Sequence, residues 1–264
     1  MLKYIYIVLF LCSTSLQAIN IDDNIDFNDV FSQSNIYLDA TKSLTLQEII
    51  QKEKDFQENN QSLLAYGYAP KFDVWIKFTL KNTANKPIKK VLEYGNPLTT
   101  HITFYNLSDN DVIKEGLYQV SPDRKTVNPV FNITLQANES KIFYMKVSSH
   151  ITTLIVKLKL WSNDTFYQKE IIHQLILGLF FASMVILGIY NLFIYFFTRD
   201  ISYLYYVLYL FGIVAHQMIY VGFSNVYTFS QDLRILFIEY APFVVVFPIV
   251  FLALFTQSFL KFNQ

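Results

Sequence analysis

The sequence predicts an all-β sandwich with one short helix, followed by an α-helical membrane region with three spans. Between residues 74 and 160, apolar side chains alternate with polar ones in several short runs, which is the period of half-buried strands. From residue 171 onward the formal charges are reduced to Arg199, Arg234, Lys261, Asp200, Asp232 and Glu239. We therefore divide the chain into an N-terminal signal (1–18), a β domain (19–168) and a membrane region (171–264).

The N-terminus has the layout of a secretory signal peptide. Lys3 precedes an apolar run from Tyr4 to Cys12, and the chain then reaches Leu16-Gln17-Ala18. This order predicts cleavage after Ala18, with an uncleaved anchor as the alternative because Leu16 is larger than the residue usual at that position. In both cases the next domain is exported. The single cysteine of the chain lies inside the signal, so the exported domain has no disulfide bond.

Charge and length limit the function of the exported domain. Lys and Arg together number 21, and so do Asp and Glu, which gives a net charge of zero. Nucleic-acid binding requires a basic surface, so no nucleic-acid partner is predicted. A segment of about 150 residues is long enough for one well-formed hydrophobic core.

After a polar leader rich in Asp and Asn, the sequence predicts a short helix near residue 46. Thr45 and Glu48 have the spacing of a capping box, in which each side chain accepts a hydrogen bond from the other residue's backbone amide. Leu46, Ile49, Ile50 and Phe56 follow at near-helical spacing. The helix is therefore expected to pack one apolar face against something larger.

Strands then follow from residue 74 to residue 160. Val74, Ile76, Phe78 and Leu80 alternate with polar residues. The same alternation recurs at Leu92/Tyr94, Ile102/Phe104, Phe131/Ile133/Leu135, Phe143/Met145/Val147 and Leu154/Val156/Leu158/Leu160. Each such strand has one apolar face that needs covering, and this predicts two antiparallel layers packed as a sandwich.

The alternation places both tryptophans on faces opposite the apolar rows, Trp75 beside Lys77 and Trp161 beside two further lysines. An aromatic ring among cationic and hydroxyl groups can stack on a sugar ring while its neighbours bind the hydroxyl groups. The predicted ligand contacts are Trp75 as a platform, Lys77 and Arg124 as donors, and Tyr94 and Tyr144 as rim hydroxyls. The alternatives are packing at a sheet edge or under a loop for Trp75, membrane anchoring for Trp161, and a solvated loop charge for Arg124.

Three apolar stretches, about 173–197, 201–221 and 235–258, are each long enough to cross a bilayer as a helix. Export of the β domain places the loop at Arg199 in the cytoplasm. Polar residues inside spans usually face other helices. The candidates are Asn191, His216, Gln217 and Glu239, with interhelical hydrogen bonding as the simplest interpretation.

Several segments of the chain resemble one family. They are 75–82, 92–97, 102–105 and 143–147 in the β domain, and 188–193, 199–200 and 203–209 in the membrane region. In these segments the chain is similar to bacterial seven-transmembrane receptors with diverse intracellular signalling modules. The resemblance implies a jelly-roll, carbohydrate-binding-like sensor domain outside the cytoplasmic membrane, facing the periplasm or the cell exterior. It also implies seven spans and, commonly, a cytoplasmic diguanylate cyclase or histidine kinase.

The sequence departs from the family pattern in two places. Lys77 stands where the family often has arginine, which removes a planar bidentate donor. The sequence also stops at Gln264 after three predicted spans. We expect either the front part of a longer receptor or a truncated relative.

A catalytic role is not predicted. The four histidines, at positions 101, 150, 173 and 216, form no HExxH pair, and no GxSxG or CxxC motif occurs. We expect no cofactor and no metal. The predicted function is the sensor part of a receptor, whose partners are membrane lipid, a saccharide or other small molecule, and a signalling protein or a second copy. The alternative is a non-catalytic protein that docks an exported partner or the cell wall and a membrane protein.

Overall fold

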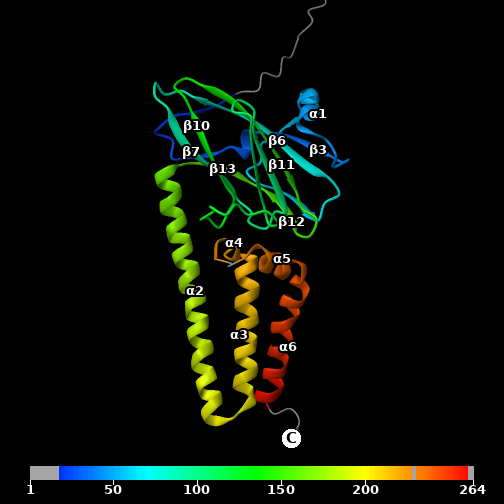
Figure 1. Ribbon diagram of the computed structural model, residues 1–264, viewed down its shortest axis with the longest axis vertical. Coiled ribbons are helices and arrows are strands. Elements are labelled where there is room, and N and C mark those ends of the chain that lie inside the picture. Colours follow the sequence, from blue (N-terminus) through cyan, green and yellow to red (C-terminus); the bar gives the residue numbers. More distant parts are fainter. Residues whose placement is uncertain (1–17, 228–229, 261–264) are drawn as a thin grey trace, which may run out of the picture.

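The computed structural model describes residues 18–227 and 230–260. A β domain lies at one end of the molecule, and the helices of the membrane region extend away from it (Figure 1). The predicted signal peptide, apart from Ala18, lies outside the described residues.

The larger sheet has the strand order β4-β3-β6-β11-β8-β9, with antiparallel neighbours. These strands are β4 (Gln57–Glu58), β3 (Asn35–Asp39), β6 (Asp73–Asn82), β11 (Ser140–Ser148), β8 (His101–Asn106) and β9 (Asp111–Glu115). A further strand, β1 (Ile19–Ile21), pairs in parallel with the end of β6. The long central strands β6 and β11 therefore set the extent of this sheet along the strand direction.

The second sheet has the order β10-β7-β13-β2. Its strands are β10 (Val130–Leu135), β7 (Ile88–Tyr94), β13 (Leu158–Ser162) and β2 (Phe27–Asp29). A separate two-stranded sheet joins β5 (Leu64–Tyr68) to β12 (Thr153–Val156). The predicted run 154–160 is thus divided between two strands, because β12 pairs with β5 whereas β13 pairs with β7 and β2.

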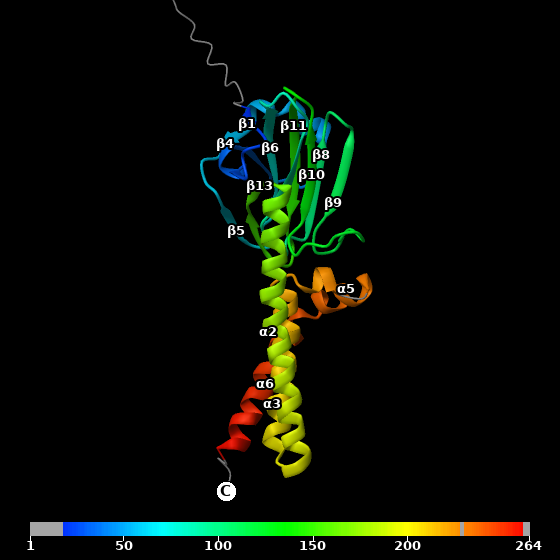
Figure 2. The ribbon, with the colours of Figure 1, turned by 90° about the vertical axis from the view of Figure 1, so that its left-hand side faces the viewer.

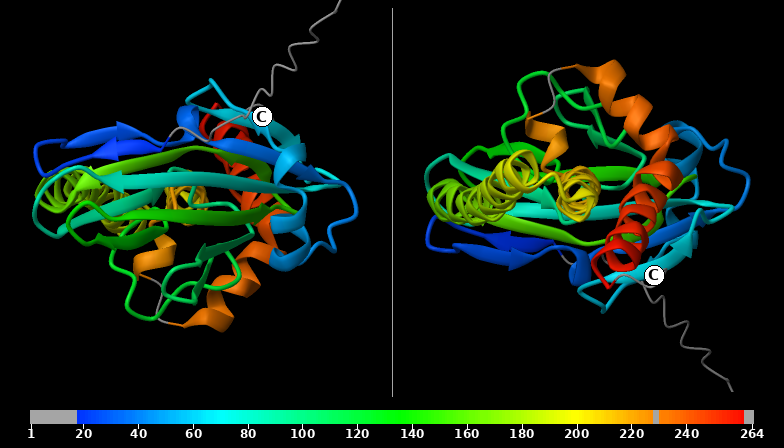
Figure 3. Two further views of the ribbon diagram at one scale, coloured as in Figure 1. Left: turned by 90° about the horizontal axis from the view of Figure 1, so that it is seen from above. Right: turned by 90° about the horizontal axis from the view of Figure 1, so that it is seen from below.

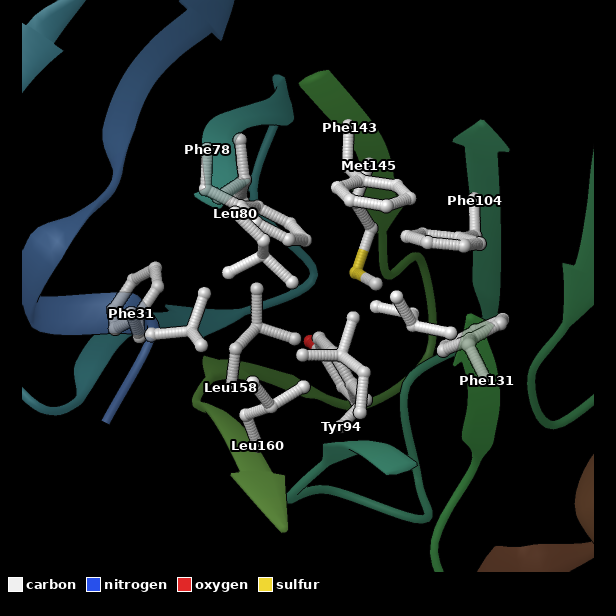
Figure 4. Packing of buried hydrophobic residues seen from close by; sticks show 14 of the residues in the cluster. Phe31, Phe78, Leu80, Tyr94, Phe104, Phe131, Phe143, Met145, Leu158 and Leu160 are labelled. Atoms are coloured by element: carbon white, nitrogen blue, oxygen red, sulfur yellow. The ribbon is translucent and has the colours of Figure 1, made fainter. Parts of the chain in front are cut away.

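The core lies between the two main sheets and confirms the predicted sandwich. Every apolar residue of the six alternating rows is buried in one cluster. From the larger sheet, Phe143 stacks between Phe78 and Phe104, at ring distances of 5.4 and 5.5 Å. Leu158 and Leu160 face them from the second sheet (Figure 4). The period-two pattern therefore identified the inward face of each strand correctly.

One α-helix lies in the β domain, within the part of the chain that the structure describes. It is α1 (Leu46–Gln51), and it begins with the predicted capping box: the Thr45 amide donates to the Glu48 carboxylate at 2.7 Å. Short 3-10 turns, η1 (Phe31–Gln33) and η2 (Glu53–Asp55), flank it in sequence. α1 lies on the outer face of the larger sheet, opposite the core, where Ile49 is fully buried.

Among the described residues, three helices are long and apolar enough to span a membrane: α2 (Asn163–Thr198), α3 (Ile201–Tyr220) and α6 (Ala241–Phe259). Viewed from below, α3 lies between the other two (Figure 3). Two shorter helices, α4 (Ser224–Tyr227) and α5 (Gln231–Glu239), connect α3 to α6 next to the β domain (Figure 2). The membrane region is therefore a row of three long helices with a short helical cap.

The predicted third span, 235–258, is wrong at its start. The helix breaks at Tyr240, and α6 begins at Ala241 with Pro242 in its first turn, where proline is well tolerated. Residues 235–239 belong to α5, so Glu239 lies outside the span and is exposed. The expectation that Glu239 makes a polar contact inside the membrane is therefore wrong.

Candidate functional site

Three of the predicted ligand residues, Trp75, Lys77 and Tyr144, lie together on the outer face of the larger sheet, but they are covered. Trp75 has an exposed fraction of 0% and Tyr144 one of 2%, since α1 and the turn that follows pack over them. The prediction of an accessible platform is wrong, and the alternative of packing under a connecting segment describes Trp75. The local alternation indicates that this face is not the main core, but it does not show what covers it.

The covered cluster combines aromatic stacking with cations. Trp75 stacks on Tyr105 at 5.7 Å and 19°, and the Lys146 ammonium lies 5.3 Å from the Trp75 ring centre. The buried Lys77 ammonium pairs with the Glu53 carboxylate of η2. The Trp75 indole N–H has no hydrogen-bond partner among the residues that the structure describes. A ligand could touch this cluster only after α1 moved.

The other two predicted ligand residues also lie in the interior. Tyr94 belongs to the inward row of β7 and is fully buried; its hydroxyl donates to the Ile155 carbonyl at 2.9 Å. Burial raises the pKa of this phenol. Arg124 is not a solvated loop charge, because its guanidinium pairs with Glu115 at 3.2 Å and donates to the Thr126 carbonyl at 2.9 Å. Both residues therefore hold the fold together instead of forming a rim.

A groove that sequence reasoning missed lies between β3, β4 and β5. Its volume is about 480 Å³, and it is lined by Ile36, Tyr37, Leu38, Asp55, Gln57, Glu58, Asn59, Asn60, Gln61, Leu64 and Tyr66. Asn59 fixes one wall: its amide donates to the Phe31 and Gln61 carbonyls at 2.6 and 2.9 Å. The polar run 57–61 was the signal in the sequence, but its position beside Tyr37 and Tyr66 depends on strand pairing.

Phe56 connects the groove to the covered cluster. Its ring lies 5.7 Å from Tyr37, which lines the groove, and 6.2 Å from Tyr144. Asp55, the last residue of η2, also lines the groove. A change in the groove would therefore reach the aromatic layer around Trp75 through Phe56 and through Tyr37, which also packs against that layer.

The β domain continues into the membrane without a linker. β13 ends at Ser162, whose hydroxyl caps α2, and α2 runs for 36 residues from there. Glu93 of β7 is buried beside this start and accepts hydrogen bonds from Lys169 at 2.7 and 2.8 Å, Asn128 at 2.7 Å and the Trp161 indole at 2.8 Å. Trp161 therefore helps to hold β13 and the start of α2 against β7.

These hydrogen-bond partners stabilise the charged form of the Glu93 carboxyl. Burial by itself raises the pKa of the Glu93 carboxyl, but the hydrogen bond and charge of Lys169, with the bonds from Asn128 and Trp161, outweigh it. The net result is a pKa below the ordinary value. Glu93 is therefore an anchored anion that joins β7, the segment before β10, and the first turns of α2.

The loop between β9 and β10 makes the second contact with the membrane helices. The Val127 amide donates to Glu170 of α2 at 2.7 Å, and Gln231 of α5 donates to the Tyr118 carbonyl at 3.2 Å. The neighbouring β7–β8 connection contributes Pro97, whose carbonyl accepts from Asn225 of α4 at 3.3 Å. Two loops of the sandwich therefore contact α2, α4 and α5.

Two histidines stack at the same end of the sandwich. The rings of His101 and His150 are 5.4 Å apart, and Tyr118 stacks on them at 5.8 and 5.3 Å. Burial and then the charge of His150 lower the pKa of His101, which Asp73 opposes. His101 is thus a proton-sensitive group beside the loop that contacts α5.

Acidification is therefore expected to lower stability. The folded chain binds fewer protons at His101 than the unfolded chain does, so stability should fall as the pH drops through about 6.5 and below. Thermal melts of the full chain at about pH 7.5 and about pH 5.5 measure this effect. His101→Gln should reduce the difference between the two melting temperatures, and an unchanged difference would contradict the assignment.

Within residues 18–227 and 230–260, no hydrogen bond joins the side chains of the polar residues predicted inside the spans to another helix. Asn191 donates to the Leu187 carbonyl of its own helix at 2.8 Å, and Gln217 lies within α3. His216 stacks on Tyr220, one turn away on α3, at 6.0 Å. A hydrogen bond between helices is made instead by Ser202 of α3 and Ser258 of α6 at 2.8 Å. Nothing in the sequence indicates that a serine of one span will pair with a serine of another.

Two family profiles match the chain on either side of the junction. The profile described as 7TMR-DISM extracellular 2 matches residues 32–162, and the profile described as 7TM diverse intracellular signalling matches residues 173–264. The chain belongs to the seven-transmembrane receptors with diverse intracellular signalling modules. As a receptor of this family, it has a periplasmic sandwich followed by helices in the inner membrane, where they contact lipid. The matched families are sensory and not catalytic.

Comparison with individual proteins adds little. No protein of curated function matches the sequence. One similar solved structure is a family GH115 4-O-methyl-α-glucuronidase with specificity for decorated arabinogalactans, at 8% identity and a TM-score of 0.26. The match covers 52% of this chain and 17% of that protein. A likeness at this level carries no argument about the receptor.

Proposed function

We propose that this receptor binds a hydroxyl-rich small molecule, such as a short saccharide, in the groove between β3, β4 and β5. The observation that carries the proposal is the lining of the groove, in which two tyrosine rings stand beside side-chain amides and carboxylates. Aromatic rings can cover the apolar face of a sugar, and planar amides and carboxylates bind its hydroxyl groups. A volume of about 480 Å³ is in the range of small-ligand sites.

In this proposal, Trp75, Lys77 and Tyr144 form the supporting layer below the groove and do not touch the ligand. Phe56 packs against both Tyr37 and Tyr144, so a ligand on Tyr37 would bias the position of the η2 segment. The signal would then pass along the larger sheet to the two loops at the membrane. An output module or a partner signalling protein receives it in the cytoplasm.

The direct connection between β13 and α2, with no flexible linker between them, supports a relay of movement from the sandwich to the membrane helices. α2 starts at the residue after β13, and Glu93 ties its second turn to β7. A rotation of the second sheet would therefore turn α2 with it. α3 packs beside α2, and α6 packs beside α3, so the movement reaches the whole described bundle.

The groove is tested by titrating the full chain in nanodiscs with a saccharide panel, using calorimetry. The double variant Gln57→Ala/Asn60→Ala removes two exposed amides of the groove. Each lost hydrogen bond is worth about 1 kcal/mol, so affinity should fall by at least about tenfold. Asn132→Ala, an exposed asparagine on β10 outside the groove, is the matched control and should bind like the unsubstituted receptor. Equal losses in both variants, or no binding across the panel, would contradict the proposal.

A further inference from the structure

A second cavity lies at the junction between the sandwich and the membrane helices. It has a volume of about 150 Å³ and receives walls from several parts of the chain. Leu98 and Leu117 come from two loops of the sandwich, Ile219 comes from α3, and Val244 and Val245 come from α6. The cavity therefore touches the parts of the receptor that must move relative to one another.

The chemistry of this cavity is apolar, in contrast to the groove. Its walls are mostly aliphatic, and the hydroxyl of Thr152 is already used, since it donates to the Leu98 carbonyl at 2.7 Å. The remaining polar side chains of the wall are His216 and Tyr220, whose rings stack at 6.0 Å. In another protein, an apolar cavity of about 150 Å³ takes up benzene or xenon, so this size suits a short hydrocarbon group.

The position of the cavity indicates where its ligand comes from. It lies at the ends of α3 and α6 that adjoin the sandwich, and both helices are long and apolar enough to span the membrane. The adjacent surface of α6 is exposed and apolar: Val246 is 53% exposed and Ile249 is 60% exposed. In a bilayer that surface contacts acyl chains. A hydrocarbon group in the outer leaflet therefore lies next to the cavity.

We propose that the junction cavity binds the alkyl end of a short-chain amphiphile that enters from the outer leaflet, with its polar end at His216. The same residues that enclose the alkyl group belong to the sandwich loops and to α3, α5 and α6. Occupancy would fix the spacing between the sandwich and the bundle. The receptor would then respond to a lipophilic ligand at the junction cavity, at a site separate from the groove and independent of any saccharide.

The test uses the full chain in phosphatidylcholine nanodiscs and a short-chain alcohol that carries an alkyl diazirine. After irradiation, mass spectrometry locates the labelled peptides. We expect saturable labelling of the α3 end around Ile219 and Tyr220, and we expect an excess of n-hexanol to remove it. Labelling that rises linearly with probe and resists competition would mean simple partitioning into lipid and would overturn the proposal.

Two neighbouring substitutions on α6 form a matched pair. Val245 lines the cavity and is 42% exposed, whereas Val246 does not line it and is 53% exposed. Val245→Phe therefore adds bulk at the cavity wall, and Val246→Phe adds the same bulk on the lipid side. Val245→Phe should reduce the saturable labelling to background, and Val246→Phe should leave it unchanged. Equal labelling in the two variants would overturn the proposal. If Val245→Phe does not fold, the competition by n-hexanol on the unsubstituted receptor decides the question.

Discussion

Replacing Glu93 by alanine is expected to destabilise the receptor by about 3 kcal/mol, because it breaks the ion pair with the half-buried Lys169 and leaves the donors of Asn128 and Trp161 without an acceptor. The loss should be largest at the junction, where Glu93 joins β7 to α2. Denaturant unfolding of the full chain in detergent measures it. The chain has two tryptophans, so a Trp75→Phe background leaves Trp161 as a fluorescent probe of this site.

The control for Glu93 is an ion pair at the surface. Lys86 and Asp23 form such a pair, with side chains 64% and 58% exposed, so Lys86→Ala should cost less than about 1 kcal/mol. The pH dependence gives a second check. Since the pKa of Glu93 is lowered in the folded state, its contribution is present above the unfolded value of about 4.3 and is lost as the pH falls through the folded pKa. A Glu93→Ala unfolding midpoint equal to that of Lys86→Ala would refute the anchoring role.

Substitution of Gly222 by alanine is expected to separate the sandwich from the helical cap. Gly222 has a φ of +76°, and a Cβ at this position would lie 2.4 Å from Cβ and 2.8 Å from Cγ of the Pro97 ring. The ring is rigid, so the clash cannot be relieved by a rotamer change and the two backbones must move apart. Hydrogen exchange should then increase in α4 and in the β7–β8 connection. Ligand-dependent output of the receptor should be lost while the sandwich stays folded.

Gly67→Ala is the matched control for this substitution. Gly67 has a φ of +81°, but a Cβ there would have no atom within 4 Å. It therefore carries the backbone strain of about 1–2 kcal/mol without the clash. If Gly222→Ala and Gly67→Ala changed hydrogen exchange at the junction equally, then the contact with Pro97 would not couple the two parts of the receptor.

Local patterns in the sequence predicted α1, three spans and the inward faces of the strands that carry the alternating rows, whereas β1 to β5 and β9 were not predicted. The row from Val74 to Leu80 is buried as predicted, because strand side chains alternate between faces whatever the sheet packs against. The capping box at Thr45 depends on residues three apart and was equally visible. The spans of α2 and α3 follow from length and apolarity, which the bilayer imposes on each helix separately.

Only the tertiary structure decided what covers the outer faces and where sites form. Trp75 is buried because α1, more than twenty residues earlier in the chain, docks over it, and no periodicity within β6 encodes that contact. Arg124 is buried because Glu115 and two loop carbonyls surround its guanidinium. The groove is built from residues 36–38 and 55–66, which the pairing of β3 with β4 brings together, and the junction cavity is built from segments as far apart as Leu98 and Val245. Such sites depend on long-range packing, whereas a sequence pattern reports only the preference of each segment for one buried face.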